Sequence, residues 1–338
     1  MNTANQRDTQ RSHFIAALGI ESAACTALAA DASSRRYYRL GESASSRLLM
    51  EVEPGSPDLP VYIHVSNYLN AIGLSAPNVM VSDFSNGLAL IEDFGMQTYT
   101  NALSEGYNER ELYELATDAL IRLHSTADRA IVLPAYDMQA LMTEVELFLD
   151  WYVPQVGVSC SMSEFRSQFL DIWQGALESV AQRRDVLVLR DYHVDNLMSL
   201  PGRSGVAACG LLDFQDALIG SRAYDLMSLC QDARRDLSPG LEFHLMQRYL
   251  NALPDIDRTQ FHADYWLLAA QRHTKVAGIF QRLAQRDGKR HYLQHQPRVI
   301  RLLRTALDRG EFTALSDLLN QYLAGWASSC NQHLLDQQ

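Results

Sequence analysis

Lysine is almost absent from this chain of 338 residues, because only Lys275 and Lys289 occur among its 29 basic residues. The first 274 residues contain no lysine, and every other basic residue is an arginine. A GC-rich genome that favours arginine codons is a sufficient explanation. The absence nevertheless excludes a catalytic lysine from most of the chain.

Paired cysteines and long apolar runs are missing as well. The five cysteines stand far apart without a C-x-x-C pair, which argues against a disulfide framework or a structural zinc site and favours a reducing compartment. No uninterrupted run of about 18 apolar residues occurs, and the alanine-rich stretch 14–30 is broken by Glu21 and closed by Asp31. We therefore expect a cytoplasmic protein without a membrane partner.

Positive charge is also in deficit, since the formal net charge is −11. A surface this acidic argues against general affinity for nucleic acid. Hydrophobic residues make up 47% of the chain and charged residues 20%, so a sizeable core is available and wholesale disorder is excluded. The length allows one large domain or two modest lobes.

The first part of the chain has the pattern of a small sheet. A short helix is expected at 12–19, and segments rich in β-formers or alternating in character lie at 25–30, 35–40 and 47–52. Tyr62, Val65, Leu69 and Ile72 form the apolar stripe of one helix, and strands at Val79–Ser82 and Leu88–Ile91 turn at Asn86-Gly87. This order predicts an antiparallel sheet with one packed helix.

From Glu109 onward the pattern becomes helical. Helices are expected from Glu109 and at 139–152, 162–182, 222–233, 238–252, 259–286 and 296–323. The clear β signal of this half spans 186–213, where Val186–Leu189 precedes two strands, Leu197–Leu200 and Val206–Leu212. The second half is thus predicted to be helical with one embedded hairpin.

Acidic and amide side chains gather at the open end of that hairpin. Residues 190–196 read Arg-Asp-Tyr-His-Val-Asp-Asn, and residues 211–217 read Leu-Leu-Asp-Phe-Gln-Asp-Ala. A hairpin brings its ends together, so Asn196 and Asp213 are expected side by side with Asp191 one loop turn away. Two oxygen ligands suit Mg²⁺, which leaves positions open for phosphates, and the third carboxylate can accept a proton from a hydroxyl.

Asp191, Asn196 and the strand-borne Asp213-Phe214 resemble the catalytic centre of the aminoglycoside phosphotransferase and choline kinase family. The resemblance implies that Asp191 is the catalytic base, that Asn196 and Asp213 hold Mg²⁺, and that the substrate is ATP. It also implies that Asp225, within Ala-Tyr-Asp-Leu, is the buried aspartate that supports the catalytic loop.

The same resemblance implies the fold. We expect an α+β, bilobal protein-kinase-like fold, with a small antiparallel β-sheet lobe and a larger, mostly helical lobe. Residues 1–95 would form the nucleotide-binding lobe ending in the hinge, and residues 96–338 the helical lobe with the catalytic loop and the substrate site. Glu92 and Phe94 fall at the hinge, whose backbone would hydrogen-bond adenine.

A narrower resemblance rests on residues 31–40, 190–197, 211–217 and 271–289, with Gln-Arg-His-Thr-Lys-Val-Ala-Gly opening the last. These segments look like the bacterial anomeric kinases of cell-wall recycling, which phosphorylate N-acetylmuramate and N-acetylglucosamine at the C1 hydroxyl. The resemblance implies an amino-sugar substrate.

The chain departs from the family at the phosphate clamp. Met50 falls where a strand lysine is expected, and the helix from Leu59 to Ala71 contains no carboxylate to pair with one. We hypothesise that Arg35 or Arg36 supplies the missing charge, with Arg36 slightly favoured, and that backbone N–H groups of the Ser33-Ser34 turn assist. Solvated strand arginines are the alternative.

Three residues are candidates for the acceptor site, each with an alternative. His193 would touch the substrate or brace its loop, and Asp216 would bind a sugar hydroxyl or cap the following helix. Arg272 lies in the stretch 271–304, which carries nine Lys or Arg residues and one acid. That stretch is either a solvated helix face or a patch that attracts an anionic substrate.

The favoured hypothesis is therefore a Mg²⁺- and ATP-dependent kinase that transfers the γ-phosphoryl group to a sugar hydroxyl. The enzymatic alternative is another alcohol acceptor, such as an aminoglycoside, choline or homoserine. The alternative from another class is a pseudokinase that acts as a binding module. Protein partners and oligomeric state are left open.

Overall fold

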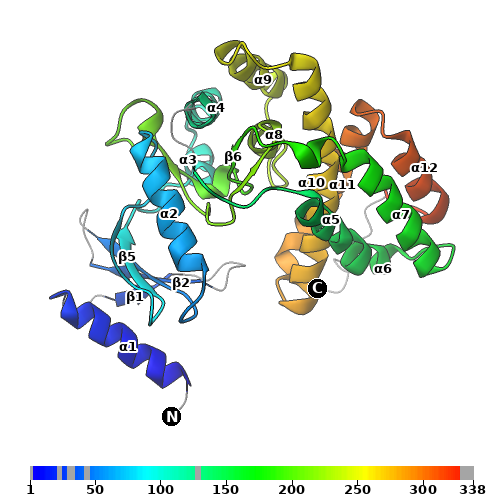
Figure 1. Cartoon of the computed structure of the whole chain (residues 1–338). Helices are drawn as coiled ribbons and strands as arrows, with labels where there is room; N and C mark the ends of the chain where they lie inside the picture. The colour runs from blue at the N-terminus through cyan, green and yellow to red at the C-terminus, as the bar shows by residue number, and fades with distance from the viewer. Residues whose placement is uncertain (1–2, 21–24, 29–34, 42–45, 126–130, 328–338) are drawn as a thin grey trace. The chain divides into compact units, whose positions relative to one another are not determined.

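The structure is a computed structural model that describes the chain except residues 1–2, 21–24, 29–34, 42–45, 126–130 and 328–338 (Figure 1). Its contacts divide the chain into two compact units. We call Met1–Thr126 with Val194–Asp216 the sheet unit, and Ala127–His193 with Ala217–Gln338 the helical unit. An antiparallel sheet and a predominantly helical part confirm the predicted α+β class. The lobe boundary at residue 95 stays a prediction.

The sheet unit is built on five antiparallel strands in the order β1-β2-β3-β5-β4. Their bounds are β1 Cys25–Ala27, β2 Arg36–Leu40, β3 Arg47–Glu51, β4 Val79–Asp83 and β5 Leu88–Glu92. The predicted turn at Asn86-Gly87 joins β4 to β5, and Gly87 has a positive φ of 65°. A side chain there would meet the Val52 carbonyl oxygen at 2.5 Å, so both the turn and the close approach require glycine.

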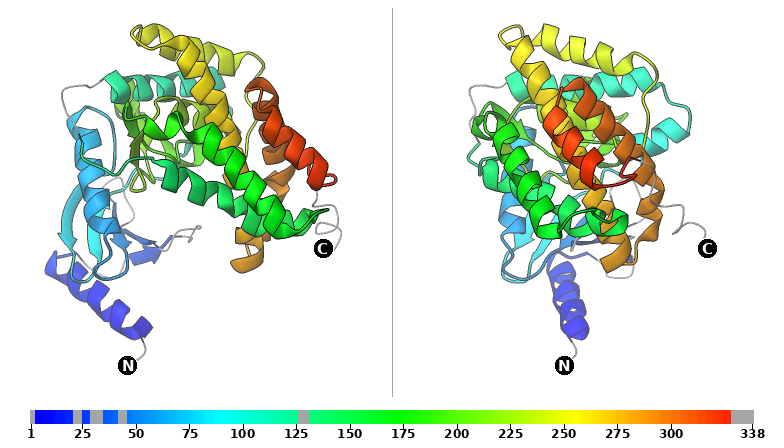
Figure 2. Two further views of the ribbon diagram at one scale, coloured as in Figure 1. Left: turned by 45° about the vertical axis from the view of Figure 1, so that its right-hand side comes forward. Right: turned by 90° about the vertical axis from the view of Figure 1, so that its right-hand side faces the viewer.

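Two helices cover opposite faces of this sheet (Figures 1 and 2). Ile15 of α1 (Thr3–Ala17) packs on Leu49, Leu90 and their buried neighbours on one face. Alternate residues of the strands point to the other face. There α2 (Asp58–Ala71) buries an apolar stripe that includes Tyr62, whose ring stacks on Phe214 at a centroid distance of 4.9 Å.

A second, smaller hairpin completes the sheet unit. β7 (Leu197–Ser199) pairs with β8 (Cys209–Leu211), so that Leu197 lies opposite Leu211. Helices α3 (Tyr99–Ser104) and α4 (Glu109–Ser125) pack against this hairpin. Thr98 caps the start of α3, and its side chain accepts a hydrogen bond from the Asn101 amide.

The helical unit contains the remaining elements. Its helices are α5 Met138–Leu147, a π-helical segment Phe148–Tyr152, α6 Val153–Val156, α7 Met162–Leu177, α8 Ala223–Cys230, α9 Leu241–Ala252, α10 Arg258–Arg286, α11 Gln296–Arg309 and α12 Thr313–Tyr322, and its strands are β6 Val186–Val188 and β9 Leu218–Gly220. The long α10 packs against α5, α8 and α11 (Figure 2). Gly278 allows this packing, because a side chain there would meet the Leu147 carbonyl oxygen at 2.2 Å.

Several elements differ from the prediction. Strand β9, which pairs with β6, was not predicted. It is only three residues long, which is too short to show an alternating pattern in the sequence. α1 begins at Thr3 rather than at residue 12. The prediction missed its first turns because they are polar and carry no apolar stripe. The helix expected at 296–323 is two helices, separated at Gly310 and at Glu311, which has a positive φ of 57°.

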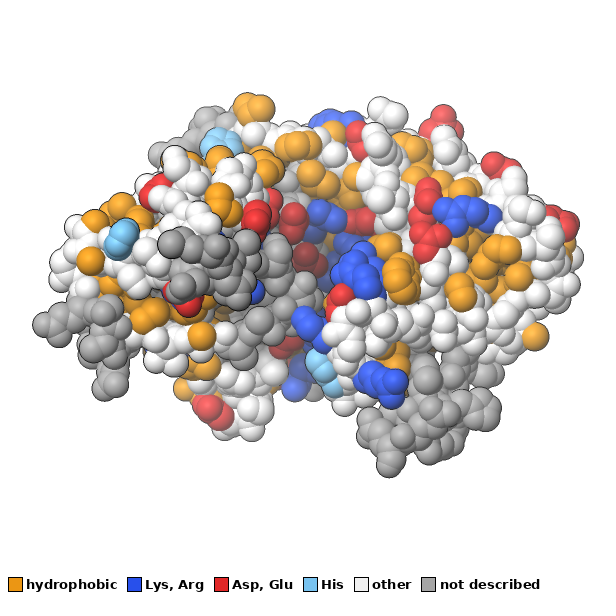
Figure 3. Space-filling model, turned by 90° about the horizontal axis from the view of Figure 1, so that it is seen from below, with side chains coloured by type: hydrophobic (Ala, Val, Ile, Leu, Met, Phe, Trp, Pro, Cys, Tyr) orange, Lys and Arg blue, Asp and Glu red, His pale blue; other side chains and the backbone are white. Residues whose placement is uncertain are grey.

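The exposed surface is mixed in character. On the face seen in Figure 3, acidic and basic side chains lie next to one another with hydrophobic side chains scattered among them. Within the described part of the chain, every helix is too short or too polar to cross a bilayer.

Candidate active site

A cavity of about 370 Å³ opens in the sheet unit. Most of its wall is apolar, and the side chains that line this part are Leu28, Leu48, Ile91, Met96, Met198 and Leu212. Arg35, Asn196 and Asp213 come together in one part of the wall, which we call the polar end, and Arg39, Asp93, Thr98 and Asn101 also line the cavity. A mostly apolar cavity with a few polar groups that come together is typical of a site for a small molecule or cofactor.

The β7–β8 hairpin positions the polar end of the cavity. The Leu212 amide donates to the Asn196 carbonyl oxygen at 2.9 Å, one step beyond the Leu197–Leu211 pair. The two ends of the hairpin therefore bring Asn196 and Asp213 to the same cavity, as the sequence pattern predicts. Asp213 has a positive φ of 56°, a strained conformation for a residue with a side chain.

Arg35 and Gln215 donate hydrogen bonds to the Asp213 carboxylate. The Arg35 guanidinium donates to its Oδ1 atom, and Gln215 Nε2 donates to the same atom at 3.0 Å. Arg35 is buried, with 9% of its side chain exposed. A buried guanidinium thus lies at the end of the cavity where the sequence pattern places phosphate.

Arg36 lies on the other face of the sheet. Side chains alternate along β2, so Arg36 shares a face with Tyr38 and Leu40, whereas Tyr37 and Arg39 line the cavity. Arg36 is also exposed. The geometry therefore favours Arg35 over Arg36, against our slight preference for Arg36. Ser33 and Ser34 lie outside the described residues.

Met50 fills the position where a strand lysine was expected. Its side chain is fully buried, and it lies opposite Tyr37 and Ala89 in the sheet. The next residue, Glu51, points to the opposite face and accepts hydrogen bonds from Arg7 at 3.1 Å and Arg11 at 2.7 Å. The β3 carboxylate thus pairs with α1, on the face of the sheet opposite the cavity.

The end of β5 and the segment after it form one wall of the cavity. Both hinge candidates, Glu92 and Phe94, line it. Glu92 accepts from Asn78 Nδ2 at 2.9 Å and pairs with Arg203, whose guanidinium lies 5.0 Å from the centre of the Phe94 ring. Asp93 accepts from Arg39 and Ser46; burial would raise the pKa of its carboxyl, but these donors hold it below its usual range.

The polar end of the cavity fits a magnesium ion bound through a nucleotide. Asn196 supplies an amide oxygen and Asp213 a carboxylate, the hard ligands that Mg²⁺ prefers, and Mg²⁺ commonly takes its other ligands from phosphates and water. No group of three or more His, Cys, Asp or Glu side chains among the described residues could hold a metal without such help.

Asp191 belongs to the helical unit and follows an unusual backbone turn. Arg190 has a positive φ of 69°, and the Asp191 amide donates to the Leu189 carbonyl oxygen at 2.9 Å. About 35% of the Asp191 side chain is exposed. Burial would raise its pKa, but the Lys275 and Arg272 cations hold the pKa below its usual range. The carboxylate is therefore ionised at neutral pH.

Asp225 holds the backbone of this turn. It is almost fully buried on α8 and accepts hydrogen bonds from the amides of Leu189 at 2.7 Å and Arg190 at 2.9 Å. Burial raises the pKa of the Asp225 carboxyl to about 7, although the two amides and Arg272 act in the opposite direction. The side chain thus ties α8 to the residues that precede Asp191.

The three acceptor candidates have different surroundings. His193 is buried, and burial together with Arg234 lowers the pKa of its imidazole. Asp216 is exposed and accepts from Gln215 Nε2 at 2.9 Å; it does not cap α8, which begins at Ala223. Arg272 is buried, and its Nη1 atom lies 3.9 Å from Asp191 Oδ1.

The basic stretch 271–304 is not a single solvated face. Arg272 and Lys275 are buried, and Lys275 Nζ donates to Glu144 Oε1 at 2.8 Å. Farther along, Arg298 and Arg301 pair with Asp236. Five of the nine cations in this stretch thus lie in ion pairs, since Arg286 also pairs with Asp287, and the first two, Arg272 and Lys275, are directed toward Asp191 and Glu144.

Comparison with known proteins identifies the family of the chain. The model of the phosphotransferase enzyme family (APH) matches residues 24–262. The chain belongs to this family. The predicted relationship to aminoglycoside phosphotransferases and choline kinases is thereby confirmed.

Two curated relatives of this phosphotransferase are named N-acetylmuramate/N-acetylglucosamine kinase. The protein from Caulobacter vibrioides is 33% identical over 334 residues, which covers 88% of this chain and 92% of the relative. The protein from Pseudomonas aeruginosa is 37% identical over 298 residues and covers 86% of each chain. A solved choline/ethanolamine kinase family protein from Mesorhizobium loti is similar with a TM-score of 0.62 at 13% identity, over 95% of this chain and all of its own. This similarity confirms the predicted kinase-like fold.

The structure also reveals a buried ionic cluster in the phosphotransferase that sequence reasoning missed. Glu144 of α5 is 6% exposed and accepts from Lys275, Gln271, Tyr136 and Arg190. One signal was available, because Glu144 lies within the apolar stripe of its helix, beside Leu141 and Val145. A carboxylate at such a position predicts a buried partner, but sequence alone does not say which one.

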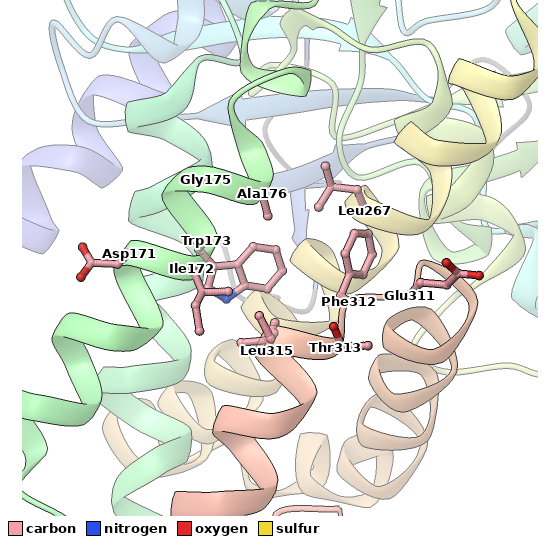
Figure 4. Close-up of a pocket in the computed structure, with 11 residues that line it drawn as sticks. Asp171, Ile172, Trp173, Gly175, Ala176, Leu267, Glu311, Phe312, Thr313 and Leu315 are labelled. Atoms are coloured by element: carbon pink, nitrogen blue, oxygen red, sulfur yellow. The ribbon is translucent and has the colours of Figure 1, made fainter.

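A second cavity, of about 380 Å³, lies in the helical unit of the phosphotransferase (Figure 4). Trp173, Phe312 and Leu315 point into it, whereas the carboxylates of Asp171 and Glu311 lie at its edges and point away. This hollow lacks the converging polar groups of the cavity in the sheet unit, so it is not the candidate active site.

Proposed function

We propose that this phosphotransferase is a Mg²⁺- and ATP-dependent kinase that transfers the γ-phosphoryl group to the C1 hydroxyl of an amino sugar, with N-acetylmuramate and N-acetylglucosamine as favoured acceptors. The observation that carries the proposal is the cavity of the sheet unit, where Arg35, Asn196 and Asp213 meet at the end of an apolar slot. That arrangement suits a nucleotide base in the slot and phosphates at the polar end.

The residues of the sheet unit would bind the nucleotide. Leu48, Ile91 and Leu212 would enclose the adenine ring, and the backbone from Glu92 to Phe94, within the expected hinge that ends at residue 95, would hydrogen-bond its edge. Arg35 would turn its fork toward the phosphates. Asn196 and Asp213 would hold Mg²⁺, which when bound neutralises phosphate charge.

Asp191 would act on the acceptor. Its carboxylate is ionised at neutral pH and would accept a hydrogen bond from the C1 hydroxyl. The hydroxyl oxygen forms a bond to the γ-phosphorus, the bond from that phosphorus to the β–γ bridging oxygen breaks, and ADP leaves while the proton passes to Asp191. Asp191 and Asn196 are five positions apart, so even an extended chain keeps them within about 18 Å.

The acceptor assignment has two supports. The named activity of the two curated relatives concerns amino sugars. In addition, Arg272 Nη1 lies 3.9 Å from Asp191 Oδ1, so a cation already faces this carboxylate, whereas Lys275 and Arg190 pair with Glu144. Such surroundings disfavour a polycationic aminoglycoside or choline and tolerate a neutral or anionic sugar.

The proposal is tested by measuring ADP release with Mg-ATP and a panel of acceptors: N-acetylmuramate, N-acetylglucosamine, kanamycin, choline and homoserine. We expect turnover with the two amino sugars and none with the cationic acceptors. Turnover only with another alcohol would refute the amino-sugar assignment and keep the kinase. If Mg-ATP binds and no acceptor is turned over, the pseudokinase alternative gains support.

A further inference from the structure

We propose that Glu144 is a positioning residue for Asp191: by holding the Arg190 side chain, it keeps the left-handed backbone turn that presents Asp191 to the acceptor. This inference rests on the proposed function, since it assumes that Asp191 acts on the acceptor hydroxyl. All residues involved belong to the helical unit.

The backbone of Arg190 is the feature that needs explanation. Its φ of 69° lies in the left-handed region, which a residue with a side chain enters at a cost in free energy and glycine does not. Strain of this kind persists only where the surroundings determine the conformation from several sides. Because Asp191 follows directly, any relaxation of Arg190 would redirect its carboxylate.

Three contacts hold Arg190 from different directions. Its amide donates to Asp225 Oδ1 at 2.9 Å, and its carbonyl oxygen accepts from Arg272 Nη1, also at 2.9 Å. The third contact is the ion pair of its guanidinium with Glu144. Glu144 acts through the side chain, whose guanidinium also lies 5.5 Å from the centre of the Tyr136 ring, so this contact depends on the residue at position 190 being an arginine.

Glu144 is itself rigidly held. Lys275 Nζ donates to its Oε1 atom at 2.8 Å, and Gln271 Nε2 and the Tyr136 hydroxyl donate to its Oε2 atom. Burial would raise the pKa of this carboxyl, but Lys275 and Arg190 lower it to about 2, so it remains a fixed negative charge. A buried, fully bonded carboxylate is a firm anchor for the Arg190 fork.

A purely structural role is the competing explanation. Lys275 and Gln271 lie on α10 and Glu144 on α5, so these contacts by themselves join the two helices. That role would not require Arg190, and glycine at position 190 would adopt the turn without strain. An arginine in a strained conformation, paired with Glu144, therefore indicates that Glu144 positions Asp191 through Arg190.

The test is a double-mutant cycle between Glu144→Gln and Arg190→Gly, with Asp264→Asn as the matched control. Asp264 is equally buried and accepts from Arg183, Ser221 and Gln260, but it lies about 16 Å from Lys275 along α10. We expect E144Q to lower kcat on the order of tenfold or more, with the KM values for ATP and acceptor changed less than about threefold.

The cycle separates the two explanations. If Glu144 acts through Arg190, adding E144Q to R190G lowers kcat little further, because the anchored side chain is already gone. Independent losses that multiply, or an E144Q loss no greater than that of D264N, would overturn the proposal. If wild-type protein turns over none of the acceptors, the proposed function fails instead.

A crystal structure of E144Q tests the inference even if the wild-type protein turns over none of the acceptors, and a comparison of R190A with R190G tests it if E144Q does not fold. In a crystal structure of E144Q we expect φ of Arg190 to leave the left-handed region; an unchanged φ would contradict the inference. We also expect R190A to have a lower kcat than R190G, since alanine resists the turn that glycine adopts. Equal kcat values for these two variants would contradict it as well.

Discussion

Arg35 and Asp213 form a direct ion pair within the sheet unit, although 178 positions separate them in the chain. The pair joins the segment before β2 to the residue that follows the β7–β8 hairpin, at the polar end of the cavity. In our account both members act on the nucleotide, Arg35 on phosphate and Asp213 on Mg²⁺. A bound Mg-nucleotide would therefore separate them, since each would exchange its partner for an opposite charge of the ligand.

The role of Arg35 is tested against its neighbour in the chain. Because Arg35 is buried at the cavity and Arg36 is exposed on the opposite face, Arg35→Met should raise the KM for ATP or lower kcat on the order of tenfold or more, as expected for a lost charge-assisted contact. Arg36→Met should leave both within about twofold. Steady-state kinetics with varied ATP measure the difference, and equal effects of the two variants would contradict the assignment.

Asp213→Asn should alter the response to magnesium. The substitution removes a negative charge from the proposed metal site, so half-maximal activity should require roughly tenfold more Mg²⁺. Asp216→Asn removes an exposed carboxylate three positions further on and provides the control. Its magnesium dependence should equal that of wild type, and any effect should appear in the KM of the acceptor. Identical magnesium titrations for wild type and D213N would refute the metal role.

Glu144 should make stability depend on pH. Its pKa is lowered from 4.5 to about 2, so the folded state favours the ionised form, and the resulting stabilisation is present above pH 4.5 and lost as the pH falls toward 2. Wild type should exceed E144Q in unfolding free energy at pH 7, and this difference should decrease by about 3 kcal/mol in total as the pH falls from 4.5 toward 2. Urea unfolding at pH 7, 5, 4 and 3 measures it. A difference that stays constant over this range would show that Glu144 does not titrate as described.

Two helix glycines should respond in opposite ways to alanine. At Gly278 of α10 a side chain would meet the Leu147 carbonyl oxygen at 2.2 Å, so Gly278→Ala should destabilise the protein by about 1–3 kcal/mol. At Gly175 of α7 an added Cβ atom would have no neighbour within 4 Å outside its own helix backbone, so Gly175→Ala should stabilise the protein by roughly 0.5–1 kcal/mol through helix propensity. Thermal unfolding of the two variants compares them, and a stabilising G278A would show that α10 does not approach α5 this closely.

Those parts of the site that depend on local sequence patterns could be predicted. The turn between Leu200 and Val206 predicted a hairpin, and the hairpin brought Asn196 and Asp213 to one cavity. The sequence pattern could not decide whether Arg35 or Arg36 faces the cavity. Alternation shows that neighbouring residues point to opposite faces of a strand, but not which face bounds a cavity, because that depends on where α1 and α2 pack.

Ionic contacts between residues far apart in the chain could not be predicted from the sequence either. Glu144, Arg190 and Lys275 meet across separations of 46 and 131 positions, and no spacing rule connects residues so far apart. Strand β9 was missed for a different reason, since Leu218–Gly220 is held by pairing with β6 rather than by a pattern of its own. Tertiary contacts, not local propensity, determine both features.

ADP release in the presence of Mg-ATP and N-acetylmuramate, compared between wild type and Asp191→Asn, tests the central claim most directly. The variant keeps the size of the side chain and removes the carboxylate that would orient the acceptor hydroxyl. We expect wild type to release ADP only when the sugar is present, and D191N to lose most of that activity, on the order of a hundredfold or more, while it still binds Mg-ATP. Equal sugar-dependent ADP release by the two proteins would contradict the account.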